Sequence, residues 1–139
     1  MRRSFNFGLI QDHHLNQLFL LMDHAATSFK KRPETAGLFR SLARMLAEES
    51  TRRHTGKERE QFFVEWKYDC SGIHPVSLMY CMDFFRKKAR EYAEQVPPVQ
   101  TFFKRVCSIL EQAVEQYVTK KVQRMVRKQQ TEASSRFGA

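Results

Sequence analysis

The fold is decided by residues 99–130, which read VQTFFKRVCSILEQAVEQYVTKKVQRMVRKQQ. Apolar side chains recur in this stretch at intervals of three and four, as they do along one side of an α-helix. The members of this stripe are Phe103, Val106, Leu110, Ala113 and Tyr117, with Phe102, Ile109, Val114 and Val118 beside them. Within a run of basic residues, the same spacing continues through Val122, Met125 and Val126. The stretch therefore predicts one long C-terminal helix, whose end is long enough to project from a compact bundle.

Three earlier segments show the same helical periodicity. They are residues 12–29, 33–53 and 75–93. Asp12 suits the position that caps the start of a helix. Pro33 and Pro75 suit the first helical position, where proline costs no hydrogen bond. The pair Pro97-Pro98 interrupts the chain before the last helix. Each of the three segments therefore predicts one amphipathic helix.

The segment 55–68 carries competing signals. Thr55 and Glu58 have the spacing of a capping box, in which the two residues satisfy free backbone N–H groups at a helix start. Aromatic side chains then follow at Phe62, Phe63 and Trp66. Such aromatic enrichment also favours a strand. We prefer a helix because of the cap, followed by a turn at residues 69–72.

These segments together predict an all-α fold, a single bundle of about five helices with a long C-terminal helix. The chain has 139 residues, of which 42% are hydrophobic, so it can bury one core. It has only 5 Gly and 4 Pro, too few for the frequent turns of an all-β protein. We expect one helical domain over residues 1–132 and a flexible C-terminal tail over residues 133–139.

The sequence holds no local motif for catalysis or for a metal ion. Its 5 glycines are isolated, so no phosphate-binding loop is present, and neither GxSxG nor HExxH occurs. His14 and His24 would lie nearly three turns apart on one helix, too far to share a metal ion. We therefore expect no enzyme activity, no cofactor and no metal site, with an active site assembled from distant residues as the remaining alternative.

The 3 cysteines indicate the cellular compartment of the protein. Their odd number and the lack of a CxxC pair argue against a disulfide framework and a zinc site. Reduced thiols in the cytoplasm or nucleus are the expectation. Cys81 and Cys107 lie beside apolar stripes and should be buried, whereas Cys70 should be exposed. No stretch approaches the roughly 20 apolar residues of a membrane span.

Basic residues are the clearest functional signal, since the formal net charge is +9. A charge of this size favours polyanions such as nucleic acid or anionic lipid, or an acidic protein partner. The residues predicted to bind either are Lys30, Lys31, Arg32, Arg52, Arg53, Arg86, Lys87, Lys88, Lys120, Lys121, Arg124, Arg127 and Lys128. No helix-turn-helix, zinc-finger or RNP motif accompanies them, so sequence-specific DNA recognition is not expected. The alternative is that they form only a solvated helix surface.

Two function hypotheses follow. The first is a non-enzymatic adaptor or scaffold domain that binds a partner peptide or helix through an apolar groove or through the long C-terminal helix. The residues predicted for this contact are Phe5, Phe7, Phe84, Val122, Met125 and Val126. The alternative is a nucleic-acid-binding protein that uses its Lys and Arg clusters without recognising sequence. Pairing of two copies through the C-terminal helix is a further alternative.

Overall fold

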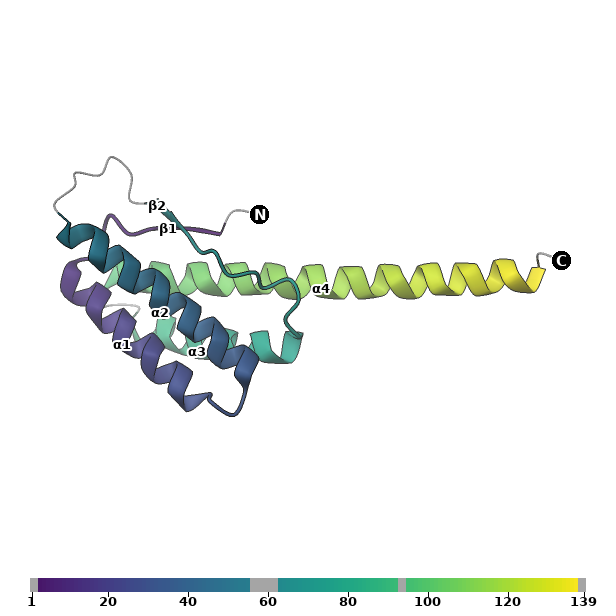
Figure 1. Ribbon diagram of the computed structural model, residues 1–139, viewed down its shortest axis with the longest axis horizontal. Coiled ribbons are helices and arrows are strands. Elements are labelled where there is room, and N and C mark those ends of the chain that lie inside the picture. The colour runs from purple at the N-terminus through teal and green to yellow at the C-terminus, as the bar shows by residue number, and fades with distance from the viewer. Residues whose placement is uncertain (1–2, 56–62, 93–94, 138–139) are drawn as a thin grey trace.

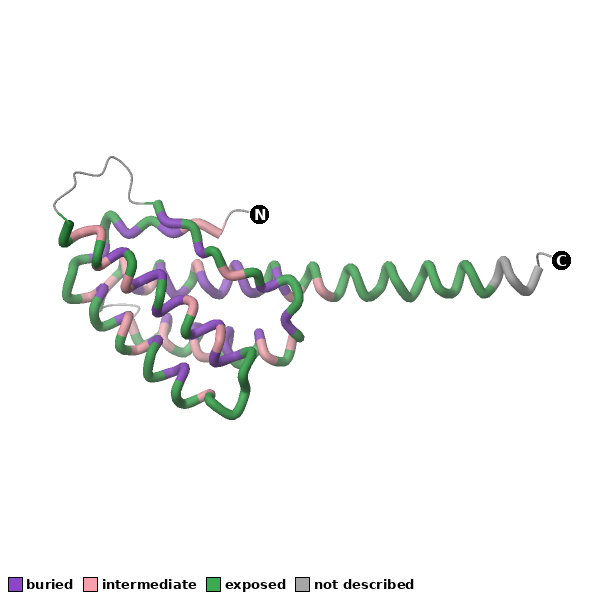
Figure 2. The backbone as a smooth tube through the Cα atoms, viewed as in Figure 1, coloured by how far each residue is buried: buried purple, intermediate pink, exposed green. Residues whose placement is uncertain are grey.

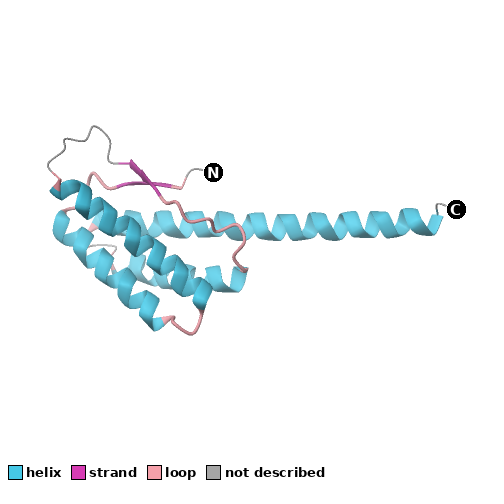
Figure 3. Cartoon of the chain, viewed as in Figure 1, coloured by secondary structure: helices cyan, strands magenta, loops and turns pink. Residues whose placement is uncertain are grey.

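The computed structural model describes residues 3–55, 63–92 and 95–137, the last five of these as backbone only (Figure 1). This part of the chain contains four helices and one small antiparallel sheet. The helices are α1 (Asp12–Ser28), α2 (Pro33–His54), α3 (Pro75–Glu91) and α4 (Pro97–Phe137). The strands are β1 (Ser4–Asn6) and β2 (Phe63–Glu65). The predicted all-α fold is confirmed, with a minor sheet added (Figure 3).

The prediction of about five helices is wrong, because the described chain contains four, and the described part of the helix expected over residues 55–68, Thr55 and residues 63–68, does not form a further helix. Thr55 closes α2 instead, since its hydroxyl donates to the backbone oxygen of Arg52 at 2.7 Å. The rest of the proposed cap, residues 56–58, and Phe62 lie outside the described residues. From Phe63 to Glu65 the exposure alternates exposed, buried, exposed, which is the period of a strand.

Aromatic side chains hold the helices together. In the described chain, α1 packs chiefly against α2, and α3 chiefly against α4. The Phe39 ring of α2 lies 5.5 Å from the Phe85 ring of α3, and Phe85 lies 5.9 Å from Phe103 of α4. All three rings are fully buried. This chain of rings joins the two helix pairs and gives the bundle one continuous core.

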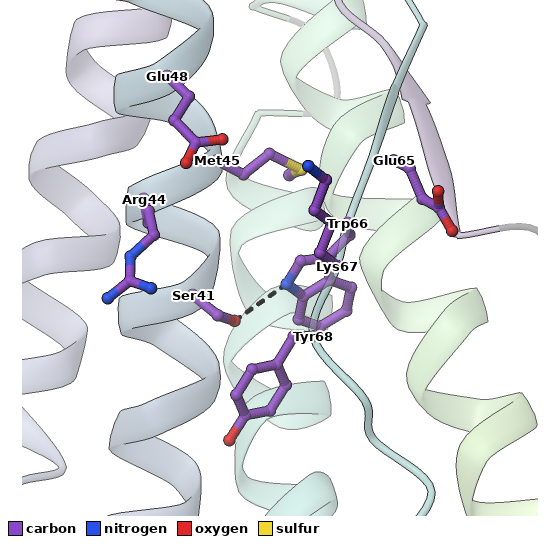
Figure 4. A pocket seen from close by; sticks show the side chains of 8 residues that line it. All are labelled: Ser41, Arg44, Met45, Glu48, Glu65, Trp66, Lys67 and Tyr68. Atoms are coloured by element: carbon purple, nitrogen blue, oxygen red, sulfur yellow. Dashed lines mark hydrogen bonds between the residues drawn. The ribbon is translucent and has the colours of Figure 1, made fainter.

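The small sheet seals the core at one side. Phe5 of β1 faces Val64 of β2, and both side chains are buried. Phe5 also packs against Phe102 of α4, with ring centroids 5.2 Å apart. The buried Trp66 indole donates to the Ser41 hydroxyl of α2 at 3.0 Å (Figure 4). The sheet is therefore part of the core of the fold.

A buried charge network ties the start of the chain to α2. The Glu49 carboxylate is fully buried and lies 3.3 Å from Nε of Arg53. The other two nitrogens of Arg53 donate to the Asp12 carboxylate and to the backbone oxygen of Phe7, both at 2.8 Å. The hydrogen bond from Arg53 also lowers the pKa of Asp12 below its usual range. Arg53 thus joins α1, α2 and the segment that follows β1.

Helix α4 is buried only along its first half (Figure 2). Among the residues of α4 whose burial is described, up to 132, Ala113 is the last buried one, and every residue from 118 to 132 is exposed. At 1.5 Å per residue, the part from residue 118 to Phe137 extends about 30 Å beyond the bundle. The predicted projection of the C-terminal helix is thus present. The backbone is helical into the expected tail as far as Phe137, and residues 138–139 lie outside the described part.

Replacing Arg53 with Ala is expected to lower the free energy of unfolding by about 2–4 kcal/mol, because the buried Glu49 carboxylate loses a cationic partner and the hydrogen bonds to Asp12 and to the Phe7 backbone oxygen are lost with it. Arg52 is the matched control, since it also pairs with Glu49 but its side chain is 40% exposed. Arg52→Ala should cost less than about 1 kcal/mol. Urea unfolding followed by fluorescence of the one tryptophan, Trp66, measures both. Equal losses in the two variants would contradict the structural role given to Arg53.

Candidate functional site

The projecting part of α4 presents an uncovered apolar stripe. Its members, Val118, Val122, Met125 and Val126, are between 46% and 56% exposed. At about 100° per residue, these four side chains leave the helix within an arc of about 100°. We call this set the valine stripe. An amphipathic face that no part of the described chain covers is typical of a surface that meets another helix.

The basic residues of the same segment fall into two sets. Lys121 and Lys128 lie about 60–80° from Val118, along one edge of the valine stripe. We call them the flanking lysines. Three others point about 120–180° away from Val118 and form what we call the outer basic face. They are Lys120, Arg124 and Arg127. None of the five has an ion pair within the described chain, and residues 116–131 contain no Asp or Glu.

The other predicted basic residues are dispersed, and several are paired. Lys30 and Lys31 are exposed at the turn between α1 and α2, far from the projecting end of α4 (Figure 1). The Arg32 guanidinium at this turn lies over the Tyr80 ring, 3.9 Å from its centroid. The remaining charges on α2 and α3 are partly neutralised by ion pairs of Arg52, Arg53, Arg86 and Lys88, whereas Lys87 is exposed. The structure therefore does not gather these clusters on one face.

Three residues predicted to contact a partner lie against the core instead. Phe5 and Phe7 are buried, because they pack against Phe102 and seal the bundle beneath the sheet. Phe84 is half-buried, with its ring 5.0 Å from Phe39. Of the predicted contact residues, only Val122, Met125 and Val126 of α4 are exposed in this structure.

A groove between α3 and α4 was not expected from the sequence. Its volume is about 500 Å³, and its lining residues are Arg86, Ala89, Arg90, Lys104, Cys107, Ser108 and Glu111. Arg86 pairs with Glu111 at 3.1 Å. Arg90 and Lys104 are exposed and have no ion pair within the described chain. The groove is therefore apolar at its base, where Ala89 and Cys107 are buried, and cationic at its rim.

Only one wall of this groove could be predicted from the sequence. Lys104, Cys107, Ser108 and Glu111 share one face of a helix because they are spaced at three, four and seven. The other wall comes from α3, and nothing in the local sequence shows that α3 lies beside that face. The pairing of the two helices therefore had to come from the structure.

Two smaller hollows have volumes of about 210 Å³ each. The first lies between α2 and the segment after β2, where Trp66 and Tyr68 stack (Figure 4). Its charged lining is balanced, with Arg44 and Lys67 against Glu48 and Glu65. The second lies beside Asp69 and Cys70. Both are smaller than the roughly 300–1,000 Å³ of ordinary small-molecule sites.

The cysteines are in environments that suppress thiolate formation. All three are buried, as expected for Cys81 and Cys107, whereas the expectation that Cys70 is exposed is wrong. Burial raises the pKa of Cys70 and of Cys107 to about 11, and it raises the pKa of Cys81 further still. The described residues contain no group of three His, Cys, Asp or Glu side chains that could hold a metal ion.

Comparisons of the chain with known protein families, with curated protein sequences and with solved structures found no match. Within the part of the chain that the structure describes, no helix has both the length and the apolar character needed to cross a membrane.

The native thiols should react slowly. A rise from 9.0 to about 11 in the pKa of Cys107 reduces its thiolate fraction at neutral pH by about 100-fold. Labelling with a chromogenic disulfide reagent at pH 7.5 should therefore be at least 100-fold slower in the folded protein than in urea. A single cysteine that reacts in the folded protein at the rate of free cysteine would contradict the burial described here.

Proposed function

We propose that this chain is a non-enzymatic interaction domain that binds an amphipathic helix of another protein through the valine stripe of α4. The observation that carries the proposal is the exposure of Val118, Val122 and Met125 on a helix that projects from the bundle. A narrow apolar stripe with three-to-four-residue spacing complements the ridge of a second helix packed along it. The bundle then serves as the base that holds α4 in place.

Electrostatics favours an acidic partner. In a pair of helices, residues beside the apolar seam face the partner's residues at the same level. Lys121 and Lys128 occupy such positions along one edge of the valine stripe. Glu or Asp on the partner would form ion pairs with them, each contributing a few tenths of a kcal/mol and speeding association.

A second copy of this chain fits the same surface less well. Residues 116–131 contain no acidic side chain, so two valine stripes packed together would bring lysines near lysines. Repulsion between like charges opposes such a pair and selects against it. Glu115 and Glu132 lie at the two ends of this segment, but two carboxylates per chain do not balance its five cations.

Binding to nucleic acid is the second candidate. The outer basic face of Lys120, Arg124 and Arg127 favours it, because three unpaired cations on one side of a helix suit a phosphate backbone. That mode of binding would leave the valine stripe exposed to water. We therefore rank it below the protein partner, for which both the apolar and the basic residues have a use.

The cellular compartment is also part of the proposal. We infer an intracellular setting, in the cytoplasm or nucleus, because the cysteines are free and buried, as is usual in proteins of reducing compartments. Buried thiols of this kind serve as small core residues.

Two matched charge reversals distinguish the candidates. Lys121→Glu/Lys128→Glu changes the flanking lysines, and Lys120→Glu/Arg127→Glu changes the outer basic face. Each pair is spaced by seven residues and changes the net charge equally. The probe is a fluorescent synthetic helix of three identical heptads, with Leu in the apolar positions and Glu beside them. Fluorescence anisotropy should show binding about tenfold weaker for the flanking variant and within about threefold of wild type for the outer variant.

The DNA arm uses a short duplex of arbitrary sequence under the same salt conditions. The second candidate would replace the proposal under two conditions. The protein would bind DNA strongly and with a steep salt dependence that only Lys120→Glu/Arg127→Glu removes, and it would not bind the acidic helix. Val122→Glu/Met125→Glu is a further check. This variant should no longer bind the acidic helix, whereas its circular dichroism spectrum should show the same helix content as wild type. Retained binding in this variant would also overturn the proposal.

A further inference from the structure

We infer that the groove between α3 and α4 is the second half of the docking surface and receives a carboxylate-bearing end of the same partner helix. We call it the α3–α4 groove. The inference rests on the proposed function and adds where the partner lies and how long it must be. Its evidence is the geometry of α4 and the charge around the groove.

One face of α4 runs from the groove to the valine stripe. Residues seven apart on a helix differ in direction by only about 20°. Glu111 of the groove, Val118 and Met125 are spaced in this way, and so are Cys107 and Val114. Val114 is half-buried and packs against the core. On this face Cys107 is buried and Val114 is half-buried, whereas Glu111 at the groove and every residue from 118 to 132 are exposed.

Helix α3 extends the apolar character of this surface. Arg86 and Ala89 form the wall opposite α4, and Met79 lies seven residues before Arg86, on the same side of α3. Met79 is 52% exposed and so adds apolar surface beside the groove. The start of α3 lies close to the point where α4 leaves the bundle, since the His74 and Tyr117 rings are 5.8 Å apart. A partner helix on α4 would pass Met79 before reaching the groove.

The charge around the groove selects its occupant. Three cations and one carboxylate line it, and Glu111 is already paired with Arg86. Arg90 and Lys104 are left to attract an anion across a base formed by Ala89 and Cys107. A helix that presents Asp or Glu beside a small apolar residue meets both demands. We therefore infer that the α3–α4 groove binds carboxylates of a protein helix.

The dimensions define the partner. From Lys104 to Met125, α4 rises about 32 Å. A helix of about three heptads spans this distance, whereas two heptads can cover the valine stripe or the groove but not both. The proposed function alone requires only the shorter contact. A longer peptide is also more helical on its own, so the result specific to this inference is a loss of affinity for the longer helix alone when the groove cations are reversed.

The test compares the three-heptad acidic peptide with a two-heptad peptide of the same repeat. Wild-type protein should bind the longer peptide at least about tenfold more tightly. In Arg90→Glu/Lys104→Glu, the longer peptide should lose about tenfold in affinity, and the shorter one should change by less than about threefold. Lys30→Glu/Lys31→Glu is the matched control, because it changes the net charge equally at an exposed site remote from α4. This control should bind both peptides as wild type does.

A direct readout accompanies the affinities. Ser108→Cys places a reactive thiol at the groove rim, where a fluorophore can be attached while the native buried cysteines stay unreactive. A nitroxide at one end of the long peptide should quench that fluorophore. As a control, the same fluorophore attached to Lys30→Cys, at the turn between α1 and α2, should show no quenching.

The possible results separate the two proposals. Equal effects of Arg90→Glu/Lys104→Glu and Lys30→Glu/Lys31→Glu on the long peptide, without quenching at residue 108, would overturn the groove inference and leave the valine stripe as the whole binding surface. Failure of both peptides to bind wild-type protein would overturn the proposed function, and this inference with it. A third result would also overturn the inference. If the free protein sediments as a dimer and Arg90→Glu/Lys104→Glu dissociates it, the groove binds a second copy of this chain.

Discussion

The packing of Phe85 against Phe103 is the contact on which the use of α4 depends. It joins α3 to the first half of α4, and through Phe39 it joins both to α2. Removing a fully buried phenylalanine ring from such a core typically costs about 3–5 kcal/mol. Because this half of the helix is fixed, the direction in which the second half leaves the bundle is fixed too. A projecting helix can present a defined surface only if its base is held in this way.

The environment of one helix face changes gradually along α4. At Cys107 it meets α3, at Val114 it is half-buried, and beyond Val118 it is in water. Apolar side chains continue at spacings of three and four from Val114 through Val118, Val122 and Met125, although the bundle no longer requires them. Stability of the bundle accounts for the first half of the pattern. The continued pattern beyond the bundle is explained if a second helix takes the place that α3 occupies earlier, and this is the physical basis of the proposed interaction.

Most of the helical architecture could be predicted from the sequence, because each helix carries its own periodic stripe and a recognisable start such as Pro33 or Pro75. The segment around Trp66 could not, since a strand there exists only through its pairing with β1, some sixty residues earlier. The predictions for Phe5, Phe7 and Cys70 were wrong because their surroundings also come from distant parts of the chain: Phe5 and Phe7 pack against Phe102, and Cys70 lies beside Ala113 of α4. The valine stripe was visible as local spacing. The α3–α4 groove was not, because half of it comes from another helix.

The exposed end of α4 also has a thermodynamic consequence. This segment lacks the tertiary packing that supplies most helix stability in proteins, and its valine and threonine residues have lower helix propensity than Ala or Leu. A partner that buries the valine stripe would supply the tertiary contact that the segment lacks, at about 25 cal/mol per Å² of apolar surface removed from water. Part of that free energy would be used to suppress fraying of α4. Affinity should therefore be modest, and specificity would come from where the charges lie, with lysines along one edge of the stripe and the arginine and lysine of the groove at its far end.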